Sequence, residues 1–228
     1  QKHVTAVVSP VFGPVFGPVL GPVLAPAIGL IIVATSIAAL ALLSLMATPA
    51  RADVWKLDPQ HTEIRFTWDH LGLSRQSGEM REVYGRLQFA PTNPTAGEVE
   101  ITMLLSGLST GVTALDTMLR SFDYFYAKQY PRITFRSTTV VPTGDKTGQL
   151  TGDLTIRGVT RPVVLDVVWN FTGEHPLAPY NPVHRGVWVT GFTASATLNR
   201  SAWGITQAAP LVSDKIMIEI NAEFTRVD

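Results

Sequence analysis

Two adjoining runs of alternating apolar and polar residues, at 148–157 and 162–172, constrain the fold of this chain more than any other feature. The apolar rows are Leu150, Gly152, Leu154 and Ile156 in the first run, and Val163, Leu165, Val167, Trp169 and Phe171 in the second. A period of two is typical of a β-strand with one buried face. Gly158 between the runs accepts a positive φ, and Pro162 lacks an amide donor and so suits the start of a strand. The two runs therefore predict an antiparallel hairpin.

The same alternation recurs along most of the chain after Asp53. Ile64, Phe66 and Trp68 alternate with polar residues, and further strands are expected at about 83–90, 97–106, 132–142, 186–199 and 214–227. Roughly eight strands joined by short turns indicate an antiparallel barrel or sandwich. Strands and helices do not alternate along the sequence, which argues against a Rossmann-like sheet.

Residues 112–130 interrupt the strand pattern. Their apolar side chains recur at spacings of three and four residues, as in a helix: Leu115, Met118, Leu119, Phe122, Phe125 and Tyr126. The pattern ends at Tyr130-Pro131, and proline disfavours helix in the residue before it. We expect a short helix or helix pair here that caps or flanks the sheet.

Composition narrows the function classes. The formal net charge is +0 at pH 7, which gives no electrostatic reason to expect a nucleic-acid partner. The chain has 0 cysteines, which excludes disulfides, thiolate catalysis and cysteine-ligated metals, and remains compatible with an oxidising compartment.

The first 52 residues differ in composition from the rest. A Pro/Gly-rich preface leads into an uncharged apolar run at 27–47, and Ala50-Arg51-Ala52 fits the small-x-small rule for signal peptidase. We therefore expect residues 1–52 to be a cleaved signal segment and 53–228 to be an exported domain, periplasmic or secreted. The alternative is an uncleaved membrane anchor, because about 20 apolar residues can span a bilayer.

Several ordered motifs resemble one family. Leu154-Thr155-Ile156-Arg157-Gly158-Val159-Thr160-Arg161-Pro162 resembles the signature of the YceI-like family of lipocalin-like barrels. The segments Asp58-Pro59-Gln60-His61-Thr62, Ser121-Phe122-Asp123-Tyr124-Phe125, Tyr130-Pro131-Arg132-Ile133-Thr134-Phe135 and Asn199-Arg200-Ser201-Ala202-Trp203-Gly204 also match the family's motifs in order. Trp203 stands where the family more often has Phe.

The resemblance implies an all-β protein, an antiparallel eight-stranded barrel with a short helical insertion near 112–130, enclosing a polyisoprenoid or quinone-type lipid and needing no other cofactor. We expect the apolar ligand to contact Phe66, Trp68, Leu119, Phe122, Phe125, Ile133, Phe135, Leu154, Ile156, Leu165, Trp169, Phe192 and Trp203. Polar side chains expected at the head group or the barrel mouth are Asp58, His61, His70, Asp116 and Arg200. The cluster Phe122–Tyr126 either lines the tunnel or plugs the barrel end.

Two motifs permit other chemistry. Gly107-Leu108-Ser109-Thr110-Gly111 spells the nucleophile elbow of α/β-hydrolases, with Asp116 and later His175 or His184 in the matching order. That elbow requires a strand-to-helix turn in a parallel sheet, so we interpret Ser109 as a strand-end residue. His61 and His70 with neighbouring aspartates suggest either a metal cluster or polar capping of the barrel.

Arg200 also has two interpretations. It either contacts the ligand near its head, or forms an ion pair with Asp116 or Asp214 that holds the loops.

Three functions follow from these patterns. The first is a non-enzymatic binding protein for an isoprenoid lipid, acting in transport, storage or sequestration, with transient membrane contact to load lipid and with a homodimer left open. The second is an enzyme, either a serine hydrolase using Ser109 or an isoprenoid-modifying activity. The third is a structural envelope protein with a filled barrel, since eight strands are about enough for side chains to fill the interior.

Overall fold

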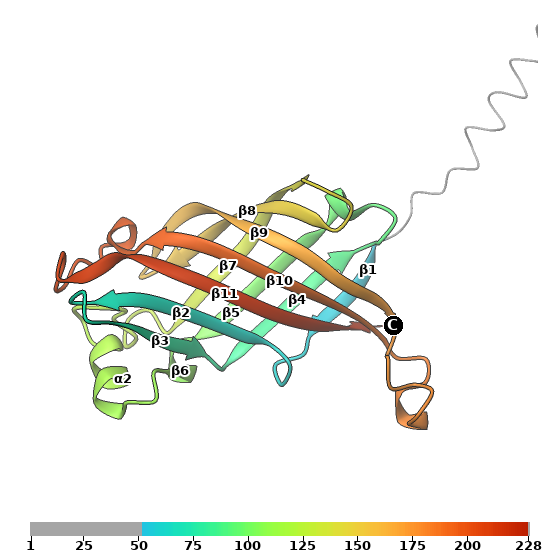
Figure 1. Cartoon of the computed structure of the whole chain (residues 1–228), viewed down its shortest axis with the longest axis horizontal. Coiled ribbons are helices and arrows are strands. Elements are labelled where there is room, and N and C mark those ends of the chain that lie inside the picture. The colour runs from blue at the N-terminus through green and yellow to red at the C-terminus, as the bar shows by residue number, and fades with distance from the viewer. Residues whose placement is uncertain (1–51, 228) are drawn as a thin grey trace, which may run out of the picture. The chain divides into compact units, whose positions relative to one another are not determined.

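The computed structural model describes residues 52–227, which form a closed antiparallel β-barrel (Figure 1). Its strands are β1 (Asp53–Leu57), β2 (Glu63–His70), β3 (Ser74–Met80), β4 (Val83–Phe89), β5 (Glu98–Leu104), β6 (Leu108–Ser109), β7 (Arg132–Pro142), β8 (Thr147–Ile156), β9 (Val159–Glu174), β10 (Trp188–Asn199) and β11 (Val212–Val227). The helix is α2 (Thr113–Leu119), and the short 3-10 turns are η1 (Pro94–Ala96), η2 (Leu105–Gly107), η3 (Pro182–His184) and η4 (Arg200–Trp203). The signal or anchor expected at 1–52 lies outside the described residues, apart from Ala52.

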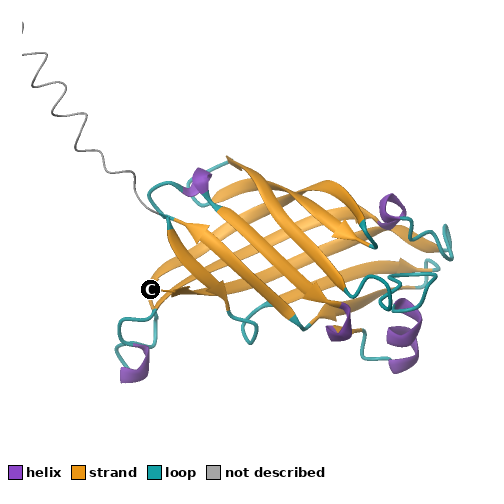
Figure 2. Ribbon diagram, turned by 180° about the vertical axis from the view of Figure 1, so that it is seen from behind, coloured by secondary structure: helices purple, strands orange, loops and turns teal. Residues whose placement is uncertain are grey.

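Eight strand positions surround the lumen. The order β1-β4-β5-β7-β8-β9-β10-β11 closes through pairing of β1 with β11. Figure 2 shows that the strands are tilted. Three positions are each occupied by two collinear strands. Along β11, for example, Leu57 of β1 pairs with Phe224 and Glu63 of β2 pairs with Asn221. The eight-stranded antiparallel barrel expected from the sequence is therefore confirmed.

The hairpin of 148–172 forms as its sequence predicts, except for the position of Pro162. Arg157 and Gly158 both have positive φ, 52° and 72°, as a tight hairpin turn requires. Pro162 lies inside β9, not at its start, and pairs with Asp153. Hydrogen-bonded and non-hydrogen-bonded pairs alternate from the turn, so Pro162 falls on a non-hydrogen-bonded pair and removes no bond to β8.

The segment expected to be helical is mostly turns. Only α2, residues Thr113–Leu119, is helical, and Tyr126 has a φ of 49° that a right-handed helix excludes. The chain folds back on itself through backbone bonds such as Phe125 N–H to the Leu119 carbonyl, 2.9 Å. The apolar spacing is present, but only some of these side chains, among them Leu119 and Phe125, pack against the barrel core.

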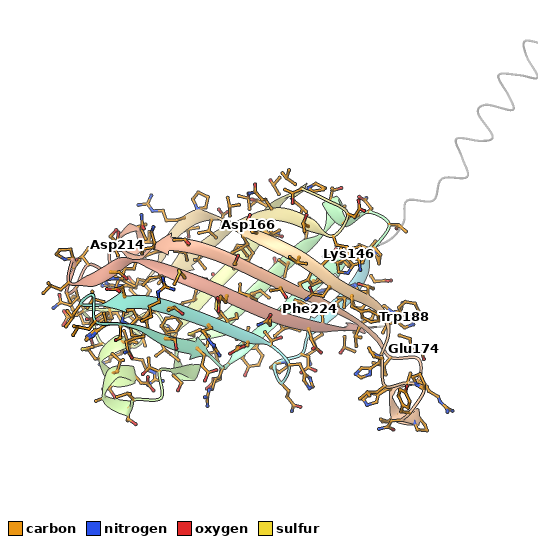
Figure 3. All side chains as sticks on the ribbon, in the orientation of Figure 1. Lys146, Asp166, Glu174, Trp188, Asp214 and Phe224 are labelled. Carbon is orange, nitrogen blue, oxygen red and sulfur yellow. The ribbon has the colours of Figure 1, made fainter. Side chains whose placement is uncertain are left out.

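The barrel has two chemically different ends. The hairpin end comprises the loops 90–97, 143–146 and 175–187 with Asp53 and Val227. The helix end comprises the turns 71–73 and 157–158 and the loops 110–131 and 204–211. Figure 3 shows Lys146, Glu174 and Trp188 toward the hairpin end and Asp214 toward the helix end. No helix within residues 52–227 is long and apolar enough to span a bilayer.

Candidate functional site

A cavity of about 710 Å³ occupies the barrel lumen. Its walls are the inward rows of the strands, which are almost entirely apolar. On β11 the row is Ile216, Ile218, Ile220, Ala222 and Phe224, and on β10 it is Phe192, Ala194, Ala196 and Leu198. Because these residues alternate with outward polar ones, the period of two in the sequence is also the rule that makes the wall apolar.

Twelve of the thirteen side chains expected to contact an apolar ligand line this cavity. They are Phe66, Trp68, Leu119, Phe125, Ile133, Phe135, Leu154, Ile156, Leu165, Trp169, Phe192 and Trp203. The exception is Phe122, which is 65% exposed and packs edge-on against Tyr126 outside the cavity wall. The cluster Phe122–Tyr126 is thus divided, with Phe125 and Tyr124 facing the lumen and Phe122 facing outward.

Glycines in the wall keep the lumen open. A Cβ on Gly78 would lie 2.4 Å from Phe66 Cζ, and one on Gly152 would lie 2.3 Å from Phe135 Cζ. The tip of each ring therefore lies against a glycine of the neighbouring strand, in space that a side chain there would take. The space that a phenylalanine would otherwise fill remains part of the cavity.

Aromatic rings narrow the lumen toward the hairpin end. Phe89 meets Trp169 and Phe192 edge-on, with ring centroids 5.3 and 5.4 Å apart. Beside them, Lys146 Nζ lies 5.9 Å from the Trp169 ring. The exposed residues that line the cavity at this mouth are largely polar or turn residues: Pro94, Pro142, Gly144, Asp145, Lys146, Thr147 and Gln149. This mouth lies beside the β7–β8 hairpin and is open to solvent through these exposed residues.

A second mouth lies at the helix end, between β3 and α2. Gln76 and Met118 both line the cavity and are exposed, and His70 lines it beside them. Trp203 closes the floor, 4% exposed, and its indole N–H donates to the Leu154 carbonyl at 3.2 Å. A ligand in the lumen would meet few polar side chains at this end, among them His70, Gln76 and Tyr124.

Arg200 is a loop clamp. The side chain lines the cavity and is 9% exposed, and its guanidinium donates to the carbonyls of Ser213, Ile205 and Val212 at 2.8–2.9 Å. Among residues 52–227 it forms no ion pair with Asp116 or Asp214. Asp214 instead accepts from the backbone N–H and the hydroxyl of Ser201. The expected ion pair is therefore wrong, although the expected role in holding the loops is met by carbonyl contacts.

Arg120 makes an equivalent clamp on the other side of the helix end. Its guanidinium donates to the carbonyls of Leu105 (2.8 Å), Ser106 (3.1 Å) and Leu108. These carbonyls belong to the segment that follows β5, where β7 begins and the regular wall is incomplete. The planar fork of an arginine satisfies several carbonyls at once. The sequence analysis did not single out Arg120.

Asp116 braces the loop that follows β6. Its carboxylate accepts from the Thr110 hydroxyl at 2.6 Å and the Thr110 backbone N–H at 2.7 Å. The hydroxyl bond is the main reason that the pKa of Asp116 is lowered, against a smaller opposing effect of burial. Asp116 does not line the cavity.

Asp58 and His61 form a pair outside the cavity wall. His61 Nδ1 lies 2.8 Å from Asp58 Oδ2, and the Asp58 bond raises the pKa of His61. Burial opposes ionisation of Asp58, but hydrogen bonds from His61 and the Gln60 N–H outweigh it, so the pKa of Asp58 is lowered. The pair closes the turn between β1 and β2, and the structure does not bring it to either mouth.

Within residues 52–227, the structure does not bring together the groups that a serine hydrolase or a metal site would need. Ser109 ends β6, as expected, and its hydroxyl accepts from the Gly111 N–H at 3.3 Å. His175 and His184 stack on one another, 4.0 Å apart, in the β9–β10 loop at the hairpin end, whereas Asp116 is in α2 at the helix end (Figure 1). In the part of the chain that the structure describes, no three metal-binding side chains gather to hold an ion.

Several cavity residues were missed by sequence reasoning. Gln76 lies in a strand whose sequence, Ser74–Met80, is mostly polar and shows no apolar row. Lys146 lies in the β7–β8 hairpin loop and Gln149 near the start of β8, and their position at the lumen depends on how far β7 and β8 extend past β5. No local pattern could have identified them.

The comparisons with known proteins agree with this geometry. A family model described as a YceI-like domain matches residues 55–224. A UPF0312 protein of Pseudomonas savastanoi pv. phaseolicola is 33% identical over 192 residues, covering 82% of this chain and 95% of its own length. BcnA of Burkholderia cenocepacia has a similar fold, with a TM-score of 0.64 at 20% identity over 73% of this chain and 98% of its own. A polyisoprenoid binding domain from Saccharophagus degradans has a TM-score of 0.54 at 12% identity, covering 76% of this chain and 98% of its own.

Proposed function

Since the chain belongs to the family of YceI-like domains, we propose that it is a non-catalytic binding protein for one long apolar lipid, such as a polyisoprenoid or the tail of an isoprenoid quinone. The observation that carries the proposal is the cavity of about 710 Å³ with its apolar wall. A barrel whose side chains filled the lumen would suit a purely structural role, and this lumen is open. The fold neighbour described as a polyisoprenoid binding domain supports the same ligand class.

Binding energy would come mainly from the hydrocarbon. Burial of apolar surface contributes about 0.8 kcal/mol for each CH₂ group, so a long chain gains affinity without any polar contact. His70 and Gln76, which line the cavity at the helix end, would contact a polar head group and would select among lipids more than they would add affinity. No other cofactor is part of the proposal.

We also propose that the barrel acts outside the cytoplasm. Support comes from the sequence that precedes Asp53, with its apolar run and Ala50-Arg51-Ala52. A lipid that is nearly insoluble in water needs a carrier or a store in such a compartment. N-terminal sequencing of protein from the exported fraction tests this: a mature chain that begins at Asp53 supports export, and an intact chain in the membrane fraction supports an anchor.

Lipid extraction and native mass spectrometry of the purified protein test the ligand. We expect one bound lipid for each barrel. The matched variants are Leu165→Asp, which places a charge in the lumen, and Val164→Asp, which places it on the 50% exposed outer face of the same strand. An unpaired charge is costly in an apolar lumen and cheap in water, so only Leu165→Asp should lose lipid. Far-UV circular dichroism establishes that both variants are folded. A lipid-free wild-type protein would contradict the proposal.

A further inference from the structure

The helix end carries exposed apolar side chains in three of its segments. Leu71 (46% exposed) and Leu73 (80%) lie in the β2–β3 turn, Leu211 (68%) lies before β11, and Met118 (45%) and Phe122 (65%) lie on α2 and the loop that follows it. We call these five residues the apolar rim. Figures 1 and 2 show α2, the β2–β3 turn and the 204–211 loop at the same end of the barrel. Exposed apolar patches of this kind mark interaction surfaces.

The rim is continuous with the lumen. Met118 is both exposed and part of the cavity wall, and Leu115 of the same helix lines the cavity behind it. The β2–β3 turn and the 204–211 loop are joined, since the Leu71 N–H donates to the Leu211 carbonyl at 3.0 Å. An apolar chain that leaves the lumen here therefore passes over apolar side chains and meets little water.

The hairpin end does not have this continuity. Its exposed apolar residues lie in the β9–β10 loop, such as Tyr180 and Val183, or at strand ends, namely Val141, Trp188 and Val227, and none of these residues lines the cavity. The exposed residues at the hairpin mouth include Asp145, Lys146 and Gln149. The two mouths are thus chemically different, and only the helix mouth has an apolar surround.

We propose that the apolar rim docks on a lipid bilayer and that the lipid enters the lumen tail first through the helix mouth. This inference rests on the proposed lipid-binding function. The occupant is a bilayer surface because the ligand resides there, and because rim and lumen form one apolar path between the two. Tail-first entry leaves the head group at the helix mouth, beside His70 and Gln76.

The charges near the rim are of both signs. The basic side chains at this end of the barrel, apart from the two arginine clamps, include Arg75, Lys128, Arg157, Arg161 and Lys215, and the acidic ones include Asp69, Asp116, Asp123 and Asp214. Docking therefore depends on burial of apolar area, with little contribution from anionic lipid, and it persists at high ionic strength.

The absence of cysteine permits a direct test with the full chain. Leu73→Cys on the rim and Val183→Cys at the hairpin end, 80% and 71% exposed in the native chain, are each labelled with an environment-sensitive dye. The probe is a vesicle of phosphatidylethanolamine and phosphatidylglycerol with brominated acyl chains. We expect quenching of the dye at 73 and none at 183, at low and at high salt. Quenching at 183 would mean that the hairpin end contacts the bilayer, as it would if a membrane anchor preceded Asp53, and it would contradict the proposal. Quenching at neither site would also contradict it.

A second arm separates docking from binding. The variant Leu73→Asp/Phe122→Asp should take lipid from vesicles about tenfold more slowly, because two rim side chains no longer enter the bilayer, while it loads the normal amount from detergent. Val183→Asp is the control and should load at the wild-type rate. Equal rates of lipid uptake from vesicles by the wild type and both variants would contradict docking through the rim, but not lipid binding. A wild-type chain that takes no lipid from either source contradicts the proposed function instead.

Discussion

Aromatic rings that lie across glycines determine how much of the lumen remains empty. Phe66 is 2.4 Å from where a Gly78 Cβ would lie, and Phe135 stands in the same relation to Gly152. At these two positions, the absence of a side chain on the glycine leaves the space that the ring occupies. The wall stays thin, and a large ring contributes apolar surface without occupying the tunnel.

We predict that Gly78→Ala narrows the tunnel. The new methyl group must displace the Phe66 ring, which lines the lumen. A ring displaced into the lumen would lower the amount of bound lipid per folded barrel, and the overpacking should lower stability by about 1–3 kcal/mol. Lipid mass and urea unfolding measure the two effects. Gly191→Ala is the control, because the nearest atom to its Cβ would be 3.9 Å away. Equal lipid content and stability in both variants would show that the ring placement is unimportant.

The Asp58–His61 pair makes the β1–β2 turn sensitive to pH. The pKa of His61 is raised above 6.5, so its contribution to stability is present below that pH and is lost as pH rises through the folded-state pKa. The pKa of Asp58 is lowered below 3.8, so its contribution is present above that pH and is lost as pH falls through the folded-state pKa. We expect the pair to be most stabilising between these limits. In an NMR titration, Asp58→Asn should lower the pKa of His61, and an unchanged His61 titration would rule the pair out.

At the scale of elements, a single extra residue in β9 reverses the faces of the strand. Trp169 pairs with Phe192 and Phe171 pairs with Gly191, so Asn170 has no partner across the strand. After this bulge Phe171 is 43% exposed, and Thr172 turns inward to bond the buried Thr190. The sequence pattern placed Phe171 in the apolar row with Trp169, and a bulge is the feature that a period of two does not reveal.

We predict that insertion of a serine after Phe171 destabilises the barrel, whereas deletion of Asn170 does not. The insertion would turn Thr172 to the outer face and break its contact with Thr190, so a loss of about 2–4 kcal/mol is expected. The deletion removes the bulge but leaves Phe171 opposite Gly191 and Thr172 opposite Thr190, so it should cost less than about 1 kcal/mol. Chemical unfolding followed by tryptophan fluorescence compares the two variants. If the insertion is as mild as the deletion, the strand tolerates a change of register.

One physical feature explains which elements the sequence predicted and which it missed. That feature is whether a strand has one face toward the apolar lumen. Alternation locates β7 to β11, because each of these strands has one face toward an apolar lumen, and the same rows identify most of the cavity wall. The strand β3 was missed because five of its seven residues are polar or charged and four are exposed. The helix was overextended because Phe122 and Phe125 share helical spacing while one faces solvent and the other faces the lumen. Arg200 was identified, but its carbonyl partners depend on a loop that no local pattern describes.

At the scale of the whole molecule, the barrel maintains an interior that packing alone would fill. Protein cores are normally close-packed, and an empty volume costs contacts that the lining side chains would otherwise make. Small residues on β10 and β11, among them Ala194, Ala196 and Ala222, leave that volume open. A bound lipid would restore the lost contacts. The stability of the barrel should therefore depend on whether lipid is bound.

We therefore predict that Ala196→Trp makes the thermal stability of the barrel independent of lipid. The indole fills the middle of the lumen, so the variant should bind no lipid, and its thermal midpoint should be the same before and after lipid extraction. In the wild type, extraction should lower the midpoint, because a ligand at 100 times its Kd stabilises the folded state by about 2.7 kcal/mol. Thr197→Trp is the matched control, since this neighbour faces outward on the same strand and is exposed. It should retain both the lipid and the shift. A wild-type midpoint that is indifferent to extraction would mean that the lumen is stable when empty, and that its walls, without help from a ligand, hold the barrel open.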